Sequence, residues 1–310
     1  MSLATPLGLG LGPLVGEVIY DTYGVTYLWI LCSLLCGLSL CLSLPVQDSY
    51  TSGDASTSPT AKTASPVAKI CAKSTQTSQK FGSILREPRL RVPTIIMTLA
   101  GLILGILITF LPLLIDSLSI PFRAGWFFSG SAVASFAIRP LVGANSDRYG
   151  RGPFVCLALL AYIISMLTLS QASTNVAFLS AGLLEGIGAG CLLPTVIALV
   201  SDRGLPQERG RLMALCIGGF DLGMAIAGPI FGSSRLWLSY SHLFLVASVI
   251  GSLALIIFLT ANSQTIRLSL LFACGKTHDR YAISEIAASY PNSDPSASPA
   301  ATTYSVPRVG

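Results

Sequence analysis

The ten-residue stretch Gly143-Ala144-Asn145-Ser146-Asp147-Arg148-Tyr149-Gly150-Arg151-Gly152 separates two long apolar segments. Asp147, Arg148 and Arg151 are ionised, and charged side chains enter hydrocarbon only at a high free-energy cost. Gly143 and Gly150 suit a close backbone approach or a turn that needs positive φ. The stretch therefore predicts a tight hairpin at a membrane surface. Taken alone, it is also compatible with a short basic turn that only sets topology.

The 310-residue chain is too apolar and too poor in charge for a water-soluble protein. Hydrophobic residues make up 52% of it, charged residues only 11%, and the mean hydropathy is +0.70, whereas soluble domains contain about 25% charged residues. The lipid bilayer is therefore an expected partner. Nucleic acid is not, because the basic residues are scattered among short loops and form no stripe.

The eight cysteines and two histidines give no sign of a disulfide framework or a metal centre. Six cysteines lie inside apolar segments, where cysteine behaves as a small buried hydrophobe, and no Cys/His cluster has the spacing of metal ligands. The N-terminus lacks the basic region of a cleavable signal peptide. No paired carboxylates and no nucleophile with a base stand at a span end. We expect no metal, no cofactor and no enzymatic activity.

The apolar segments predict an all-α membrane protein. A membrane helix needs about 20 mostly apolar residues. Eight candidate spans satisfy this measure: 3–20, 25–45, 92–115, 124–146, 153–171, 176–200, 212–234 and 237–262.

Two segments have a different composition. Residues 46–91 are dominated by Ser, Thr, Ala and Lys, which predicts a flexible linker that ends in a short basic amphipathic piece. Residues 263–310 end in Pro/Ser/Ala-rich sequence and are expected to form a mostly disordered tail.

The positive charges predict the orientation. With eight spans, the N-terminus, the linker, the Asp147 hairpin, loop 201–211 and the tail share one side of the membrane, and that side holds 16 of the 19 Lys and Arg residues. Positive charge accumulates in cytoplasmic loops. We therefore expect both termini in the cytoplasm and the protein in the plasma (cell inner) membrane.

Two motifs carry a resemblance to a known family. The spacing G-x-x-x-D-R-x-G-R in the hairpin resembles the signature loop of the major facilitator superfamily. A Gly-Pro pattern with small-residue spacing occurs in the first span and recurs in the seventh, and such spacing lets helices approach closely. Its residues are Gly8, Gly12, Pro13 and Gly16 in the first span, and Gly228, Pro229 and Gly232 in the seventh. Parallel six-helix repeats build this superfamily.

The resemblance implies a register and an organisation. The eight spans correspond to family helices five to twelve, so that 1–45 holds the last two helices of the N-terminal half and 92–262 the six-helix C-terminal half. Pro194 and the loop Pro206-Gln207-Glu208-Arg209-Gly210-Arg211 are similar to further family features. The chain departs from the family pattern at Gly152, where a basic residue is expected, and at Glu17, where a glycine is expected. Family helices one to four are lacking.

Four ionisable residues lie within the spans: Glu17, Arg139, Glu185 and Asp221. Such residues usually face a protein or water-filled interior and mark ion or substrate pathways. Asp221 lies about 14 Å from the start of its helix and Arg139 about 10 Å from the end of its span, so the two side chains are expected at similar depth, where they can form an ion pair. A structural role near the outer interface is favoured for Glu17.

Each of the other three residues has a functional and a structural interpretation. Glu185 is the best candidate proton carrier, because burial favours the neutral form of a carboxyl group and a change of access then releases the proton. Asp221 is a candidate for coupling or substrate recognition, or it makes a structural hydrogen bond to a neighbouring helix. Arg139 is a third candidate, or it reaches the membrane boundary or braces the hairpin.

By resemblance, the parent protein is a secondary transporter, an antiporter that exports a small organic solute with protons as the coupling ion. Asp147 and Arg148 are expected to lock the cytoplasmic side against residues 8–16, as part of a gating loop with Gly143, Gly150 and Arg151. The alternative is that this polypeptide is a truncated, non-transporting fragment, or a half-transporter that needs a partner.

Overall fold

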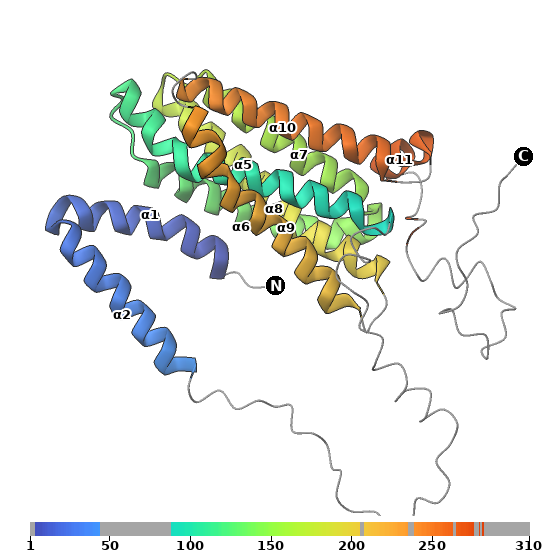
Figure 1. Ribbon diagram of the computed structural model, residues 1–310, viewed down its shortest axis with the longest axis horizontal. Helices are drawn as coiled ribbons and strands as arrows, with labels where there is room; N and C mark the ends of the chain where they lie inside the picture. The colour runs from blue at the N-terminus through green and yellow to red at the C-terminus, as the bar shows by residue number, and fades with distance from the viewer. Residues whose placement is uncertain are drawn as a thin grey trace, which may run out of the picture.

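The computed structural model describes residues 4–43, 88–204, 208–234, 239–262 and 265–275, together with residues 279 and 281. Within these residues the chain forms helices and no strand (Figure 1). The helices are α1 (Ala4–Tyr23), α2 (Val25–Ser43), α5 (Pro88–Leu118), α6 (Ala124–Tyr149), α7 (Gly152–Ser170), α8 (Asn175–Arg203), α9 (Arg209–Ser234), α10 (Tyr240–Ala261) and α11 (Ile266–Ala273).

Six of these helices are long and apolar enough to cross a membrane: α2, α5, α7, α8, α9 and α10. They confirm an all-α membrane protein. The other two predicted spans are α1, of 20 residues, and α6, of 26 residues. Neither is among the helices that meet this measure of length and hydropathy, and α6 carries Arg139 within its length. α6 packs along α8, and α8 is long and apolar enough to cross a membrane. We therefore expect α6 to cross the membrane as well.

Helices α5 to α10 form a bundle with a continuous apolar core. α5 packs against α9 and α10, and α8 packs against α6 and α7. Large side chains that are fully buried, such as Ile103, Phe127, Phe178 and Phe244, fill the space between them. Lipid is as apolar as this core, so helix association in a bilayer depends on close contact rather than on the hydrophobic effect.

Glycines on α8 bring that helix directly against α6. A Cβ added at Gly186 would overlap the carbonyl oxygen of Ser131, and one added at Gly182 would lie 2.7 Å from the carbonyl oxygen of Phe127. Gly190 is equally confined, with the carbonyl oxygen of Ser135 2.9 Å from the added atom. This glycine row, at every fourth position of α8, fixes the distance between the two helices.

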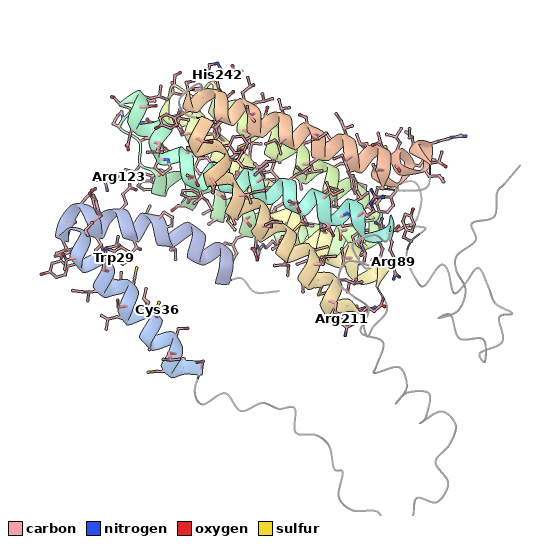
Figure 2. The ribbon with its side chains drawn as sticks, viewed as in Figure 1. Trp29, Cys36, Arg89, Arg123, Arg211 and His242 are labelled. Carbon is pink, nitrogen blue, oxygen red and sulfur yellow. The ribbon has the colours of Figure 1, made fainter. Side chains whose placement is uncertain are left out.

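The first two helices lie beside the bundle (Figure 1). α1 packs against α6, and α2 packs against α1, and no residue of α2 is buried. Figure 2 shows Trp29 and Cys36 on α2, away from the bundle. One contact of α1 with α6 is at Gly10, whose carbonyl oxygen accepts a hydrogen bond from Ser129 Oγ at 3.0 Å.

The predicted packing glycines are not at these contacts. A Cβ added at Gly8, Gly12, Gly228 or Gly232 would meet no atom within 4 Å, and one at Gly16 would meet only Leu28. Gly10 makes the contact of α1 instead, because residues two positions away in a helix point to nearly opposite sides. On α9, Gly219 and Gly223 lie against α5. Apart from the contact of Gly16 with Leu28, these five glycines therefore do not lie against a neighbouring helix in the described part of the chain.

Two predicted segments contain helical residues near one end. α5 begins at Pro88, so the last residues of the predicted linker are helical, and residues 46–87 lie outside the described part of the chain. Within the predicted tail, residues 266–273 form a helix, α11, which packs on α10 and α7. The prediction that most of 263–310 is disordered stays a prediction. Residues 282–310 lie outside the description.

Candidate functional site

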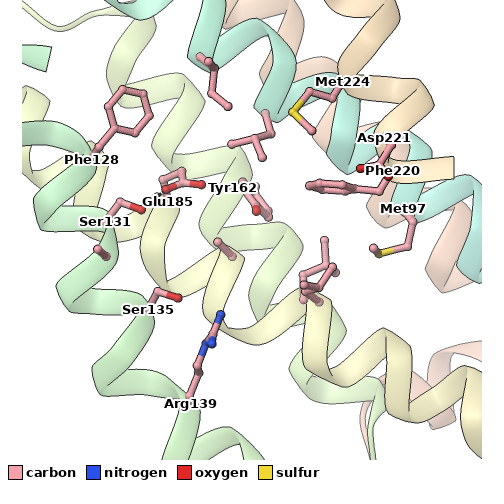
Figure 3. A pocket seen from close by; sticks show the side chains of 16 residues that line it. Met97, Phe128, Ser131, Ser135, Arg139, Tyr162, Glu185, Phe220, Asp221 and Met224 are labelled. Carbon is pink, nitrogen blue, oxygen red and sulfur yellow. Dashed lines mark hydrogen bonds between the residues drawn. The ribbon is translucent and has the colours of Figure 1, made fainter. Parts of the chain in front are cut away.

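A cavity of about 330 Å³ opens between α5, α6, α7, α8 and α9 (Figure 3). Most of its wall is apolar, with aromatic and thioether groups from Met97, Phe128, Phe220 and Met224. The polar groups in the wall are few: Ser131, Ser135, Arg139, Tyr162, Glu185 and Asp221. An apolar pocket with a small number of convergent polar groups is the usual form of a small-molecule site.

The three candidates Arg139, Glu185 and Asp221 all line this cavity, from α6, α8 and α9 respectively. Figure 3 shows Asp221 across the cavity from Glu185, with Arg139 nearer to the end of α6. The three residues therefore line one cavity, and an ion pair between Arg139 and Asp221 stays a prediction.

Glu185 has the most defined surroundings of the three. Its side chain is 3% exposed, and Ser131 Oγ donates a hydrogen bond to its Oε2. The contact forms because Gly186, the next residue of α8, lies directly against the backbone of Ser131. A buried carboxyl group in a membrane helix is costly when charged. Glu185 is therefore an ionisable group enclosed between α8 and α6.

Several residues of the cavity were missed by the sequence interpretation. Ser131 and Ser135 precede Arg139 at intervals of four, so a polar stripe along one face of α6 was readable from the sequence. Tyr162 is 2% exposed and lies beside Glu185 in the cavity wall. It stands in a long uncharged run, in which no periodic signal distinguishes a cavity-lining residue from a lipid-facing one.

The signature hairpin is shorter than predicted. α6 continues to Tyr149, and Gly150 follows with a positive φ of 86°, a conformation that glycine adopts without strain. Gly143 is within the helix, and an added Cβ there would meet no atom within 4 Å. Arg148 in the last turn interacts favourably with the helix C-terminus. The side chain of Asp147 lies outside the described part of the chain.

Ion pairs fasten the end of the bundle at which the hairpin lies, called here the hairpin end. Arg151 of the hairpin pairs with Asp202 near the end of α8 at 2.6 Å. Arg89 on α5 pairs with Glu208 beside the start of α9 at 3.5 Å. In Figure 2, Arg89 and Arg211 lie at this end and Arg123 and His242 at the other.

The opposite end of the bundle holds α1 against α6. Glu17 Oε2 accepts a hydrogen bond from the backbone N–H of Gly125 at 3.2 Å, in the first turn of α6. Asp21 pairs with Arg123 at 2.8 Å. A carboxylate at a helix N-terminus is stabilised by the unpaired N–H groups there. Glu17 therefore has a structural contact at this end, which is the role that the sequence favoured.

Among the described residues, no group of three or more His, Cys, Asp or Glu side chains is placed to hold a metal ion.

The helices form a polytopic α-helical membrane protein, with ionisable groups in a cavity inside the bundle and a charged hairpin at one end. The chain belongs to the Major Facilitator Superfamily, whose family model matches residues 94–269.

Its relatives include transporters with different named substrates. Multidrug resistance protein 3 of Bacillus subtilis (strain 168) is 28% identical over 134 residues, which are 43% of this chain and 26% of the relative. Major facilitator superfamily domain-containing protein 10 of Homo sapiens is 34% identical over 110 residues, 36% of this chain and 24% of the relative. The 3-(3-hydroxy-phenyl)propionate transporter of Escherichia coli (strain K12) is 29% identical over 128 residues, 41% of this chain and 32% of the relative. The aligned part thus spans a third or less of each relative.

Proposed function

We propose that this chain supplies the solute site and the proton-carrying group of a secondary transporter that moves a small organic compound by alternating access. The single observation that supports it best is the convergence of Arg139, Glu185 and Asp221 on one cavity. Membership of the superfamily and the transporters among its relatives also support it. Proton-coupled efflux is the proposed direction and coupling.

In this proposal Glu185 carries the proton. While the cavity is closed to water the carboxyl group is neutral and hydrogen-bonded to Ser131. Opening toward water favours the charged form, so the proton leaves on that side. Solute binds against the apolar wall, with Asp221 and Arg139 as charged recognition groups. Solute and proton then exchange in the same space as the helices rock.

The hairpin is proposed as the gate. Asp147 and Arg148, with Gly143, Gly150 and Arg151, would hold the cytoplasmic side closed against residues 8–16 and release it when the two halves rock. The excess of basic residues on the hairpin side supports a cytoplasmic position for that end and for both termini. The plasma membrane is the proposed location.

Two observations favour a second candidate, in which this polypeptide transports only together with further helices. α2 has no buried residue, and Asp221 faces the cavity yet is exposed. An ionisable residue in a membrane helix normally faces the interior of a helix bundle or a water-filled cavity and not lipid. The missing wall would come from a partner or from a longer form of the same protein.

The first experiment measures transport in proteoliposomes that contain the full chain, with ethidium as an aromatic cation and 3-(3-hydroxyphenyl)propionate as an aromatic carboxylate. We expect an imposed pH gradient to drive one of them, and Glu185→Gln to lower that rate by about tenfold or more, a barrier change of about 1.4 kcal/mol. Asp116→Asn is the matched control, because Asp116 is exposed on α5 and outside the cavity.

The outcomes separate the two candidates. Equal rates for Glu185→Gln and the unmodified chain would contradict the proton-carrier role. No transport of either probe by the chain alone, with gradient-driven transport in native membranes that contain it, would favour the second candidate.

A further inference from the structure

A buried arginine joins four parts of the chain at the hairpin end. Arg203, the last residue of α8, is 0% exposed. Its Nε and Nη2 donate to the carboxylate of Asp279 at 2.6 and 3.1 Å, and its Nη1 donates to the backbone oxygen of Arg89 at 2.9 Å. Nη2 also donates to Asn262 Oδ1 at 3.1 Å, and the guanidinium lies 5.2 Å from the ring centroid of Tyr281.

This cluster holds the part of the chain that follows α11 against the end of the bundle. A charged side chain is enclosed completely only where its donors are matched by acceptors. Asp279 supplies two of those acceptors, and its Oδ1 also accepts from the backbone N–H of Tyr281 at 3.1 Å. One guanidinium group therefore joins the end of α8, the start of α5 and the end of α10 to the C-terminal segment.

The same segment is seated on the signature hairpin. A Cβ added at Gly152 would overlap the backbone oxygen of Phe272 and lie 3.1 Å from the Cα of Ala273. Gly275 has a φ of 72°, and an added Cβ there would lie 2.7 Å from the backbone oxygen of Tyr149. The end of α11 thus lies directly on the turn between α6 and α7. Gly152 is the position at which this chain departs from the basic residue of the signature, and the contact accounts for the departure.

α11 itself is held on the bundle by its buried side. Phe272 lies 6.2 Å from Phe258 of α10, measured between ring centroids, and Ser269 Oγ donates to the backbone oxygen of Thr260 at 3.4 Å. The opposite side of α11 leaves Ile266 and Leu270 exposed. The segment is therefore fixed at three places: on α10, on the hairpin and on Arg203.

We propose that α11 with residues 274, 275, 279 and 281, called here the C-terminal strap, restrains the α6–α7 hairpin, and that release of Asp279 from Arg203 frees the hairpin to move. The strap couples the hairpin to the ends of α5, α8 and α10. The hairpin is also joined directly to the end of α8 by the Arg151–Asp202 pair. Its effect on transport rests on the proposed function, whereas the restraint on the hairpin does not.

Hydrogen exchange of the full chain in lipid nanodiscs, read by mass spectrometry, tests the restraint without any substrate. We expect Asp279→Asn to raise the exchange rate by about tenfold or more in two separate places, residues 265–281 and the hairpin residues 146–153, because local opening sets the exchange rate. Gly152→Leu is expected to give the same two changes by displacing α11. The matched controls are Asp116→Asn and Gly210→Ala, since a Cβ added at Gly210 meets no atom within 4 Å.

If the exchange rate rises only in residues 265–281 in both variants, the C-terminal strap is docked but does not restrain the hairpin, and the proposal is overturned. Unchanged exchange rates in both places would also overturn it. Should Asp279→Asn fail to give folded protein, Tyr281→Leu removes only the ring over Arg203, and a smaller rise in the same two places is expected. Absence of any rise with Tyr281→Leu would also overturn it. None of these outcomes depends on transport. The hydrogen-exchange result therefore tests the restraint on the hairpin even if the proposed function is wrong.

Discussion

Ser131 and Glu185 are joined by a hydrogen bond between two side chains of the cavity wall. The hydroxyl of Ser131 is the donor to this carboxyl group. Its position depends on two helices that meet at Gly186, so the chemistry of Glu185 and the distance between α6 and α8 are linked. A substitution at either residue reports on the same contact.

The first prediction concerns Ser131. Ser131→Ala leaves the buried carboxyl group without its donor, and an unmatched buried polar group costs about 1–3 kcal/mol. We expect pH-gradient-driven transport of the active probe to fall by about tenfold, and Ser131→Thr, which keeps the hydroxyl, to retain most of the rate. Ser180→Ala is the control, because Ser180 bonds only within its own helix, to the oxygen of Ala177. Equal transport rates for Ser131→Ala and the control would mean that Ser131 has no part in proton transfer at Glu185.

The sequence identified the charged residues of the site better than the neutral ones. Arg139, Glu185 and Asp221 stand out because ionised groups are rare in membrane helices. Ser131 and Tyr162 do not, because hydroxyl groups also occur on surfaces between helices that have no ligand. Arg203 was read as part of a loop, since its burial depends on Asp279, which is 76 residues away in sequence.

At the scale of the helix, the glycine row of α8 controls how closely α6 approaches. A side chain larger than hydrogen at Gly186 would force the backbone of α6 outward, and overfilling a close contact typically costs about 1–3 kcal/mol. The cavity wall and the Ser131–Glu185 contact lie on this surface. Stability and site geometry should therefore fall together.

The second prediction follows from that row. Gly186→Leu is expected to lower the thermal unfolding midpoint in detergent by several degrees, since about 1 kcal/mol corresponds to about 2–4 °C in a domain of this size. Gly218→Leu on α9 is the matched control, because a Cβ added there meets no atom within 4 Å. Equal unfolding midpoints for the two variants would mean that α6 moves to accommodate the leucine side chain without loss of stability.

The helices were predicted more reliably than their contacts. All eight predicted spans appear as helices within a few residues of the expected bounds, because an apolar stretch of this length has few alternatives in a membrane. The glycines chosen from the Gly-Pro pattern were not those that touch neighbours. Several small residues on one helix satisfy the same spacing rule, and only the arrangement of neighbouring helices selects among them.

At the scale of the whole molecule, ion pairs lie at both ends of the helix bundle. One joins α1 to the bundle and the other joins two parts of the bundle. At one end Asp21 pairs with Arg123, and at the hairpin end Arg151 pairs with Asp202. The side chains of Asp21 and Arg123 are about half exposed, at 45% and 51%, so this pair contributes at most about 1 kcal/mol. Contacts of that strength can break and re-form as helices rock.

The third prediction tests the hairpin at this scale. Asp147→Asn is expected to slow transport of the active probe by about tenfold while its equilibrium binding, measured by dialysis, stays unchanged, because a gate affects the rate of interconversion and not the solute site. Asp116→Asn serves as the charge-matched control. Loss of binding in Asp147→Asn would argue against a gating role.

The buried arginine also has a consequence for synthesis. Arg203 is made 76 residues before Asp279, and at typical rates of chain elongation that interval lasts roughly 4–15 s. During those seconds its guanidinium lacks the carboxylate that matches it and must stay in water or among lipid headgroups. The ribosome therefore also delivers α9, α10 and α11 before Asp279 can enclose the end of α8, and this contact is completed only after α11 has been made.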